Sequence, residues 1–414
     1  MQSSLLVIGF VYPEPNSSAA GTRMIQLIEA FQEQNYKVTF ATTCKKSDHA
    51  FDLESIGVQL VEIQLNHSSF DVFIKTLNPT IVLFDRFMTE EQFGWRVSEH
   101  CPDTLRILDT EDLHFLRKER QKAFNSKQET AINFFKSDIA KREIASIYRS
   151  DLSLVISETE FEILTETFKI DSSLLCYLPF MIASENCEAR ADSKSFSERH
   201  DFVSIGNFLH PPNLDAVRYL KKEIWPHIRK ALPETKLHIY GAYDTPIIKE
   251  MHNEQEGFLV HGFVEDAFEV LNSARVLLAP LRFGAGLKGK LIQAMQTGTP
   301  CAMSSVAAEG MFGSMKPNGV VEDTIDPFVA GTLALYSDAA EWEKFQQQGF
   351  SILKNRFEKN LHQTNFMKRV KTLQGNLNSH RDQNFIGQML SHHQMQSTKY
   401  MARWIETKNT KSNL

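Results

Sequence analysis

The chain has 414 residues, too many for one ordinary hydrophobic core, so we expect two or three domains. Hydrophobic residues make up 42% of the chain and charged residues 23%, a balance that is typical of folded globular proteins and excludes a disordered chain. A net charge of -6 argues against nucleic acid as a partner, because proteins that neutralise phosphates carry a surplus of lysine and arginine.

Cysteine usage and the first residues bear on the compartment. The 5 cysteines are scattered and form no C-x-x-C pair, which favours a reducing compartment over a disulfide framework or a zinc site. Residues 1–15 carry no basic segment before their short apolar run, so we interpret them as a core strand and not as a secretory signal. No apolar run reaches the ~18 residues of a membrane-spanning helix. These features predict a cytoplasmic protein.

The first half of the chain alternates short apolar runs with longer amphipathic segments. Continuous runs of branched and aromatic residues are typical of parallel strands that are covered on both faces. This half is therefore predicted to be a doubly wound α/β domain. The strands are expected at 5–10, 37–42, 57–63, 80–85, 105–109 and 152–157, with helices that include 21–34 and 88–100.

The second half repeats this rhythm after a polar stretch at 181–200 that is typical of a linker. The sequence thus predicts two Rossmann-like domains, at 1–180 and 201–378, followed by a C-terminal segment at 379–414. The strands of the second domain are expected at 201–206, 236–241, 257–263, 275–280, 299–304 and 318–323, and its helices include 212–230, 265–273 and 287–296.

The C-terminal part, 325–405, has a helical pattern with a polar break at 374–384. After the break, apolar side chains recur at helical spacing, and these are Phe385, Ile386, Met389, Leu390, Tyr400, Met401 and Trp404. The pattern favours an amphipathic helix that crosses back and packs on the first domain. A helix on a membrane surface is the alternative, but the polar face is not strongly basic.

The segment "RFGAGLKGKLIQAM", residues 282–295, fits two nucleotide-binding patterns. Its glycines follow a predicted strand and open a predicted helix, where unpaired N–H groups attract an anion. The NTPase P-loop pattern fails because Leu291 replaces the serine or threonine that binds magnesium. A dinucleotide fingerprint would lie at the first strand of a domain, whereas this loop lies late in the second domain, and "GFVYPEPNSSAAG", after the first strand of the first domain, is not such a fingerprint. The loop indicates a phosphate site, with an ordinary tight turn as the alternative.

Other polar residues follow strands of both predicted domains. In "SIGNFLHPPN", Gly206, Asn207 and His210 lie at the carboxyl edge of the second domain's first strand, where open α/β sheets bind ligands. In "DTEDLHFLRKER", Asp112 and His114 follow a strand of the first domain, together with Asp109 and Glu111. The alternatives are a loop with a helix cap and acids at a helix N-terminus.

Taken together, these motifs resemble the GT-B glycosyltransferases of family 4 in the sugar-transferase classification. The resemblance lies in "GNFLHPPNLDAVRYLKKEIWP", "LHIYG", "VHGFVED" and the segment 274–311, with "DTEDLHFLRKER" in the first domain. It implies two domains facing across a cleft, a nucleotide-sugar donor on the second, and an acceptor on the first. It also implies transfer with retention, no essential metal, and no cofactor besides the nucleotide sugar as co-substrate.

The resemblance assigns roles to single residues. Lys290 would pair with the donor diphosphate, His114 would lie near the transferred sugar, and Asp112 would complete the catalytic set. The predicted donor-binding residues are Gly21, Gly206, Asn207, His210, Arg282, Gly284, Gly286, Gln293 and Glu309.

The chain also departs from this family. The carboxylate pair spaced E-x7-E would fall on Ala285 and Gln293, so both acids are absent. A basic pair after the second domain's first strand is replaced by 208–210, for which Arg282 is a candidate substitute. These losses leave a non-catalytic protein that binds sugar nucleotides or glycans as the alternative. An NAD(P)-dependent enzyme is a third interpretation, for which the fingerprint at the first strand of a domain is missing. The motifs of the second domain fit transfer better than a GT-B epimerase.

The sequence thus predicts a glycosyltransferase that extends a surface polysaccharide or glycolipid, with a glycan or lipid-linked acceptor. The basic stretches 117–122 and 141–149 could bring the first domain to an anionic membrane. Glu119 and Glu143 within them favour the alternative of solvated helix faces with Glu–Lys pairs.

Overall fold

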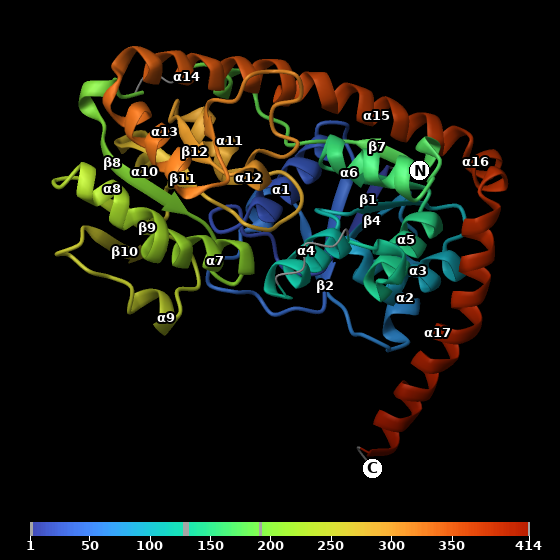
Figure 1. Cartoon of the computed structure of the whole chain (residues 1–414). Coiled ribbons are helices and arrows are strands. Elements are labelled where there is room, and N and C mark those ends of the chain that lie inside the picture. Colours follow the sequence, from blue (N-terminus) through green and yellow to red (C-terminus); the bar gives the residue numbers. More distant parts are fainter. Residues whose placement is uncertain (1–2, 127–131, 190–192, 413–414) are drawn as a thin grey trace.

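A computed structural model describes residues 3–126, 132–189 and 193–412. Figure 1 shows two lobes, each built on a sheet with helices on both faces. All strand pairs within the two named sheets are parallel, as the continuous apolar runs require. The predicted α/β class with two Rossmann-like domains is therefore confirmed.

The first sheet has the strand order β3-β2-β1-β4-β5-β6-β7. The order reverses between β1 and β4, which makes the carboxyl edge beside these two strands the expected ligand edge. The short β7 was not predicted, since three residues carry little periodic signal. The strands are β1 (Ser4–Gly9), β2 (Lys37–Thr42), β3 (Gln59–Glu62), β4 (Ile81–Asp85), β5 (Leu105–Asp109), β6 (Leu152–Val155) and β7 (Leu175–Tyr177). The helices are α1 (Ala19–Gln32), α2 (Ser69–Leu77), α3 (Arg86–His100), α4 (His114–Ser126), α5 (Asp138–Arg149) and α6 (Glu158–Glu162).

The second sheet has the order β10-β9-β8-β11-β12-β13, with its reversal between β8 and β11. The predicted helix 212–230 is two α-helices joined by a π-helical turn at Leu220–Ile224. The strands are β8 (His200–Ile205), β9 (Leu237–Tyr240), β10 (Phe258–Gly262), β11 (Ala274–Ala279), β12 (Cys301–Met303) and β13 (Gly319–Val321). The helices are α7 (Pro211–Tyr219), α8 (Trp225–Ala231), α9 (Pro246–Lys249), α10 (Ala267–Ser273), α11 (Gly289–Gln296), α12 (Ser305–Ala308), α13 (Ile325–Ser337) and α14 (Ala339–Ile352).

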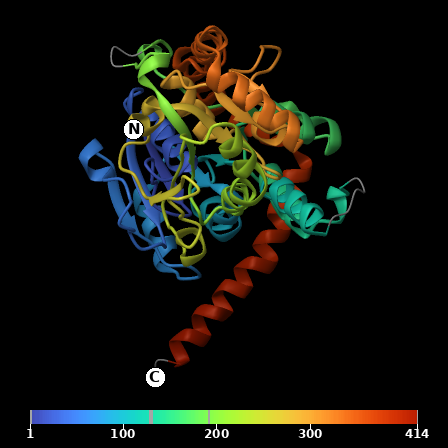
Figure 2. The ribbon, with the colours of Figure 1, turned by 60° about the vertical axis from the view of Figure 1, so that its left-hand side comes forward.

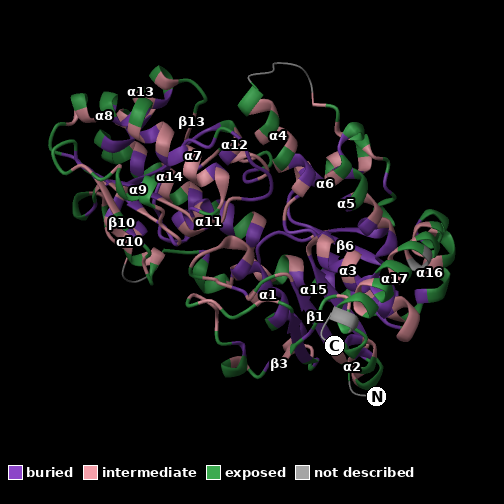
Figure 3. Ribbon diagram, turned by 90° about the horizontal axis from the view of Figure 1, so that it is seen from below, coloured by how far each residue is buried: buried purple, intermediate pink, exposed green. Residues whose placement is uncertain are grey.

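Buried residues concentrate on the strands and on the inner faces of the helices in both lobes (Figure 3). Between the lobes, the predicted linker 181–200 contains short 3-10 turns at Ser184–Asn186 and Phe196–Glu198. Residues 190–192 of that linker lie outside the described residues.

The last three helices return to the first lobe, as predicted. They are α15 (Lys359–Gly375), α16 (Leu377–Gln383) and α17 (Phe385–Ser412), and Figure 1 shows α14 and α15 running from one lobe to the other. Phe366 of α15 packs edge-on against Phe31 of α1, with ring centroids 5.6 Å apart. The return thus begins before residue 378, where we placed the end of the second domain. The predicted break at 374–384 is largely helical, because α16 fills it.

One face of α17 is attached to the first lobe. Ala402 is 2% exposed, and Lys399 forms an ion pair with Glu99 at 2.6 Å. The exposed large apolar side chains of this helix are Phe385, Ile386, Met389, Tyr400, Met401 and Trp404. Figure 2 shows the end of this helix leading away from the body of the molecule. Among the described residues, no helix combines the length and apolar character that a bilayer crossing requires.

Candidate active site

The glycine-rich loop joins β11 to α11 and is pressed against the first domain. Gly286 has φ +64°, a left-handed conformation that favours glycine. A Cβ atom added there would come within 2.9 Å of the Asp112 Cβ, and one added to Gly289 would come within 2.7 Å of the Ala19 Cβ at the start of α1. The glycines are therefore required by the close approach of the two domains. Helix α11 begins at Gly289, two residues later than predicted.

Lys290 lies in the first turn of α11 and points to the end of β8. Its Nζ donates a hydrogen bond to Asn213 Oδ1 at 2.9 Å, and a Cβ added to Gly206 would lie 2.9 Å from the same Nζ. Burial of the ammonium group, and then the charge of Lys288, lower the pKa of Lys290 to about 7. No carboxylate of the described residues forms an ion pair with it. The site thus holds a cation without its own counter-ion.

Lys288 is a second lysine of this loop, which the sequence reasoning did not single out. Its Nζ donates hydrogen bonds to the carbonyl oxygens of Ala285 at 3.0 Å and Gly286 at 2.5 Å. Burial lowers the pKa of Lys288, although Glu309 acts in the opposite direction. The lysine therefore fixes the loop conformation and adds positive charge beside Lys290.

The loop after β8 is organised by its own polar groups. Asn207 Oδ1 accepts a hydrogen bond from the Leu209 amide at 2.9 Å, and the Asn207 carbonyl accepts one from Asn213 Nδ2 at 2.9 Å. His210 Nε2 lies 3.3 Å from Arg117 Nη1 of the first domain. Burial, followed by the charge of Arg117, lowers the pKa of His210 to about 4. The imidazole is therefore neutral at neutral pH and accepts from Arg117 across the cleft.

The predicted catalytic residues of the first domain lie opposite the glycine loop. Burial alone would raise the pKa of Asp112, but Arg117 holds it well below its usual range, with Arg117 Nε 2.8 Å from Asp112 Oδ2. His114 Nδ1 lies 3.1 Å from the Asp112 carbonyl oxygen. The buried Glu143 accepts from the amides of His114 and Phe115, at 3.1 and 2.9 Å. Glu143 thus caps α4 and fixes the start of the helix that carries His114.

Glu309 and Arg282 are both engaged in ion pairs. Glu309 accepts two hydrogen bonds of 2.8 Å from Arg120 of the first domain, and Arg120 also donates to the Gly284 carbonyl at 2.9 Å. Arg282 pairs with Asp215 at 2.6 Å. Arg282 is therefore already paired with an acid, and Glu309 holds the domains together beside the donor loop.

Two other predicted donor-binding residues differ in their surroundings. Gln293 is half-buried, one turn after Lys290 on α11. Gly21 is buried, and a Cβ added to it would lie 2.4 Å from the backbone of Glu14. Gly21 therefore packs against its own preceding loop, while Ala19 is the residue of α1 that meets the donor loop.

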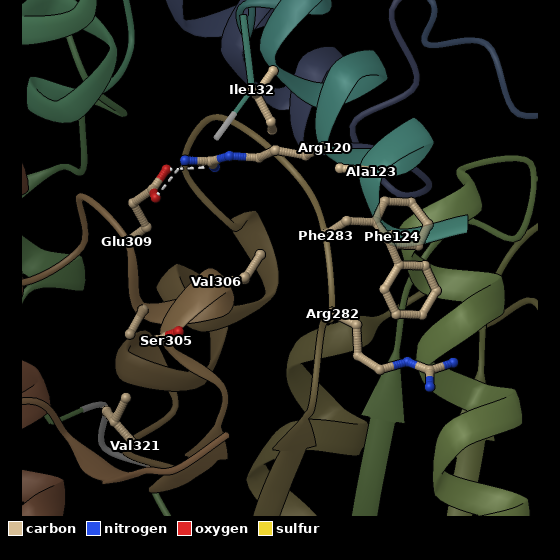
Figure 4. A pocket seen from close by; sticks show the side chains of 11 residues that line it. Arg120, Ala123, Phe124, Ile132, Arg282, Phe283, Ser305, Val306, Glu309 and Val321 are labelled. Atoms are coloured by element: carbon tan, nitrogen blue, oxygen red, sulfur yellow. Dashed lines mark hydrogen bonds and ion pairs between the residues drawn. The ribbon is translucent and has the colours of Figure 1, made fainter. Parts of the chain in front are cut away.

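Beside the Arg120–Glu309 pair lies a cavity of about 840 Å³ between the domains. Figure 4 shows the pair on one side of the cavity and Arg282 pointing away from it. Most of the lining is apolar, and these residues are Ala123, Phe124, Ile132, Phe283, Val306, Ala308 and Val321. Among the described residues, no cluster of three or more histidine, cysteine or acidic side chains is arranged to hold a metal ion.

The first-domain partners of this site were not predicted from the sequence. Arg117 and Arg120 lie within the quoted motif, and their spacing of three on α4 places both on one helix face. That spacing was an available signal. Glu143 and Glu160 come from other helices and have no local signal, because only the fold brings them to the site.

Comparisons with known proteins agree with this architecture. Residues 199–338 match the model of a family described as glycosyl transferases group 1. No curated protein matches the chain.

Solved structures resemble the chain over nearly its whole length. A sucrose-phosphate synthase from Thermosynechococcus elongatus has a TM-score of 0.67 at 14% identity, covering 90% of this chain and 99% of that one. Anabaena HepE, solved with UDP and glucose, has a TM-score of 0.65 at 11% identity, covering 90% and 100%. S. aureus TarM, as a G117R mutant with fondaparinux, α-GlcNAc-glycerol and UDP, has a TM-score of 0.67 at 8% identity, covering 89% and 99%.

Two Rossmann-like domains with their ligand edges facing each other define the GT-B class of enzymes. Residues 199–338 of the chain match the glycosyl transferases group 1, and the whole chain shares the fold of solved glycosyltransferases. The resemblance to this family and the two-domain GT-B fold predicted from the sequence are thus confirmed.

Proposed function

We propose that the protein transfers a sugar from a nucleoside diphosphate sugar to a glycan or lipid-linked acceptor, with retention of configuration and without a resident metal or other cofactor. The observation that carries this proposal is Lys290, at the N-terminus of α11, which among the described residues has only an amide oxygen as its hydrogen-bond partner. A diphosphate would supply the missing negative charge. HepE and TarM were solved as complexes with UDP, which supports this class of donor.

In the proposed reaction, the bond between the anomeric carbon and the diphosphate oxygen breaks while an acceptor hydroxyl oxygen bonds to the same face of that carbon. The hydroxyl proton passes to the departing phosphate oxygen, so no protein nucleophile is needed. Lys290, Lys288 and the start of α11 stabilise the charge that grows on the leaving group, which lowers the barrier more than it strengthens substrate binding. His114 and Asp112 orient the sugar and the acceptor from the opposite side.

The cavity beside Glu309 supports an acceptor that is partly apolar. Arg120, which lines it, is already neutralised by a carboxylate, and most of the remaining lining is aliphatic or aromatic. We propose that this cavity receives the apolar part of the acceptor. Octyl glycosides should therefore be better acceptors than methyl glycosides, and Phe124→Ala should remove that preference without changing the donor KM. Equal activity of the wild-type protein with octyl and methyl glycosides would contradict this assignment.

We further propose that the protein works in the cytoplasm and meets its acceptor at a membrane surface. Arg117, Arg120, Arg142 and Arg149 of the two basic stretches form ion pairs with acidic side chains, so these stretches offer little free charge. The exposed apolar face of α17 fits an interfacial helix better, because it carries tryptophan and tyrosine beside Arg403 and Lys408. Pelleting with anionic vesicles should be lost in Phe385→Ser/Trp404→Ser. Binding by that variant would refute the role of α17.

The experiment that tests the proposed function is an assay of hydrolysis and transfer with UDP-, GDP- and ADP-sugars. Wild type should use one of these donors, and Lys290→Ala should lose that activity while Lys316→Ala, at an exposed lysine of the same domain, keeps it. Full activity of Lys290→Ala would overturn the proposed mechanism. Calorimetric binding of a donor without any turnover would favour the alternative of a non-catalytic sugar-nucleotide-binding protein, which Gln293 in place of a glutamate motivates.

A further inference from the structure

A buried carboxyl group of the first domain bridges the two halves of the site. Glu160 of α6 is fully buried. Its Oε1 accepts a hydrogen bond from the Leu113 amide at 3.0 Å and another from the Gly286 amide at 2.8 Å. Leu113 belongs to the same domain as Glu160, whereas Gly286 lies in the donor loop of the other domain. One oxygen atom of Glu160 therefore accepts hydrogen bonds from both domains.

The two amides belong to the segments that carry the chemistry. Leu113 lies between Asp112 and His114, and Gly286 lies two residues before Lys288. The bond to Gly286 exists only while the domains are closed, whereas the bond to Leu113 does not depend on closure. Other contacts cross the cleft, such as Arg356–Glu158 at 2.7 Å, but that pair is more exposed and does not touch either segment.

We propose that Glu160 is a positioning residue that aligns Asp112 and His114 with the donor loop when the two domains close. This inference rests on the proposed function, because it assigns the donor to that loop. Glu160 itself contacts backbone amides and no substrate. Its loss should therefore weaken the reaction more than it weakens donor binding, since the phosphate contacts lie within the second domain.

The ionisation of Glu160 supports this role and gives it a pH signature. Burial, and then the charge of Asp112, raise the pKa of Glu160 to about 8, while Lys288 acts in the opposite direction. Asp112 and Lys288 are the charged groups that face it from the first and second domains, and Glu158 is its acidic neighbour on α6. The neutral carboxyl is thus favoured in the closed state. Glu160 should therefore stabilise the closed state fully below the ordinary pKa of a glutamate, and this stabilisation should be lost as the pH rises through about 8.

The experiment compares Glu160→Ala and Glu160→Gln with Glu162→Ala, a control at an exposed position of the same helix. Glu160→Ala should lower kcat by about 10²-fold, because small misplacements of reacting groups have effects of that size. Its donor Kd should change less than about threefold. Glu160→Gln keeps an acceptor oxygen and should retain most of the activity at pH 7. Glu162→Ala should match wild type.

The pH profile of kcat at saturating donor separates positioning from a general role in folding. With donor bound, Lys290 is held in its charged form, so a fall in wild-type kcat above about pH 8 reports Glu160. Glu160→Gln, which cannot ionise, should show no such fall. Identical profiles for both proteins would overturn the proposed pH signature.

Hydrogen exchange provides a readout that needs no activity. The amides of Leu113 and Gly286 should exchange faster in Glu160→Ala than in wild type or Glu162→Ala. Unchanged exchange at Gly286 together with unchanged kcat would overturn the inference. If wild type uses no nucleotide sugar, the proposed function fails, and faster exchange in Glu160→Ala would still support the bridge.

Discussion

The two ligand edges that face each other across the cleft handle charge in opposite ways. On the first domain, Arg23 and Arg117 each pair with an acid of the same domain, Asp109 at 2.8 Å and Asp112 at 2.8 Å. On the second domain, Lys290 and Lys288 donate hydrogen bonds only to neutral oxygen atoms of the residues that the structure describes. These two arginines of the first edge are thus neutralised within their own domain, whereas an anion is needed to neutralise the two lysines of the second edge.

This difference has a physical reason. An ammonium group without a counter-ion in a protein interior weakens the fold, and such groups are typically kept for function. An edge whose cations are paired with acids suits a neutral sugar and its acceptor. An edge whose cations have no acidic partner suits a diphosphate. The comparison thus connects the charges of the two domains with the two substrates of the proposed reaction.

The difference in charge between the two edges can be tested most directly by removing one cation from each edge. Lys290→Met should lower kcat/KM by about 10³-fold, since a group that stabilises developing charge contributes effects of this size. It should not lower the midpoint of thermal unfolding, because no ion pair is lost. Arg23→Met should lower the free energy of unfolding by about 3–5 kcal/mol, because it leaves Asp109 buried without its partner.

Thermal unfolding and steady-state kinetics of the same two variants check this prediction. Lys316→Met, at an exposed position, is the control for loss of a lysine. A large drop in stability of Lys290→Met would mean that the lysine belongs to the fold, and the contrast between the two edges would then be refuted.

The close approach of the two edges can be tested by forcing them apart. Gly286→Ala adds a Cβ atom 2.9 Å from the Asp112 Cβ and strains a backbone with φ +64°. We expect a loss of about 10²-fold in kcat, because the reacting groups would no longer align. Gly375→Ala is the matched control, since its added Cβ meets no atom within 4 Å. Equal kinetics of the two variants would show that close approach at Gly286 is not needed.

The fold was largely predictable because its strands are buried on both faces. Runs such as 37–42 and 105–109 match β2 and β5 residue for residue. The helix α16 and the early return of α15 were not predictable in the same way, because polar residues at 374–384 read as a loop and only contacts with the first domain reveal where the chain crosses. Packing of Phe366 on Phe31 is a tertiary fact without a local pattern.

The residues of the candidate site also differ in whether the sequence could predict them. Lys290 and the glycines could be found because one short segment contains them in a spacing that suits an anion. Arg282 could not be judged from the sequence, since its pairing with Asp215 joins residues 67 positions apart. Glu160 was out of reach for the same reason, because its two partners come from different domains.

The pH dependence of donor binding tests whether Lys290 of the second edge gains its charge from the donor. In the free protein the pKa of Lys290 is lowered to about 7, so its charge is lost as the pH rises through that value, whereas a bound diphosphate would keep it protonated. The Kd of the preferred nucleoside diphosphate should therefore rise by about tenfold between pH 7 and pH 8.5. Calorimetry in buffers of different ionisation enthalpy should detect proton uptake on binding. A flat profile would mean that Lys290 stays charged without the donor.

The smallest expected effect concerns Gln293, where the family's second glutamate is absent. A carboxylate at this position would accept hydrogen bonds from ribose hydroxyls more strongly than the amide does. It would also lie three residues from Lys290 on α11 and partly neutralise the lysine that the diphosphate needs. Because these effects oppose each other, Gln293→Glu should change the donor Kd by no more than about threefold at pH 7. The variant should, however, flatten the rise in Kd above pH 7, since the added acid raises the pKa of Lys290. Binding of the same nucleotide as its 2′-deoxy form separates the two effects, because only the ribose contact is lost. A steep pH profile retained in Gln293→Glu would mean that position 293 does not sense the lysine, and the uncompensated charge of the second edge would then be independent of the missing glutamate.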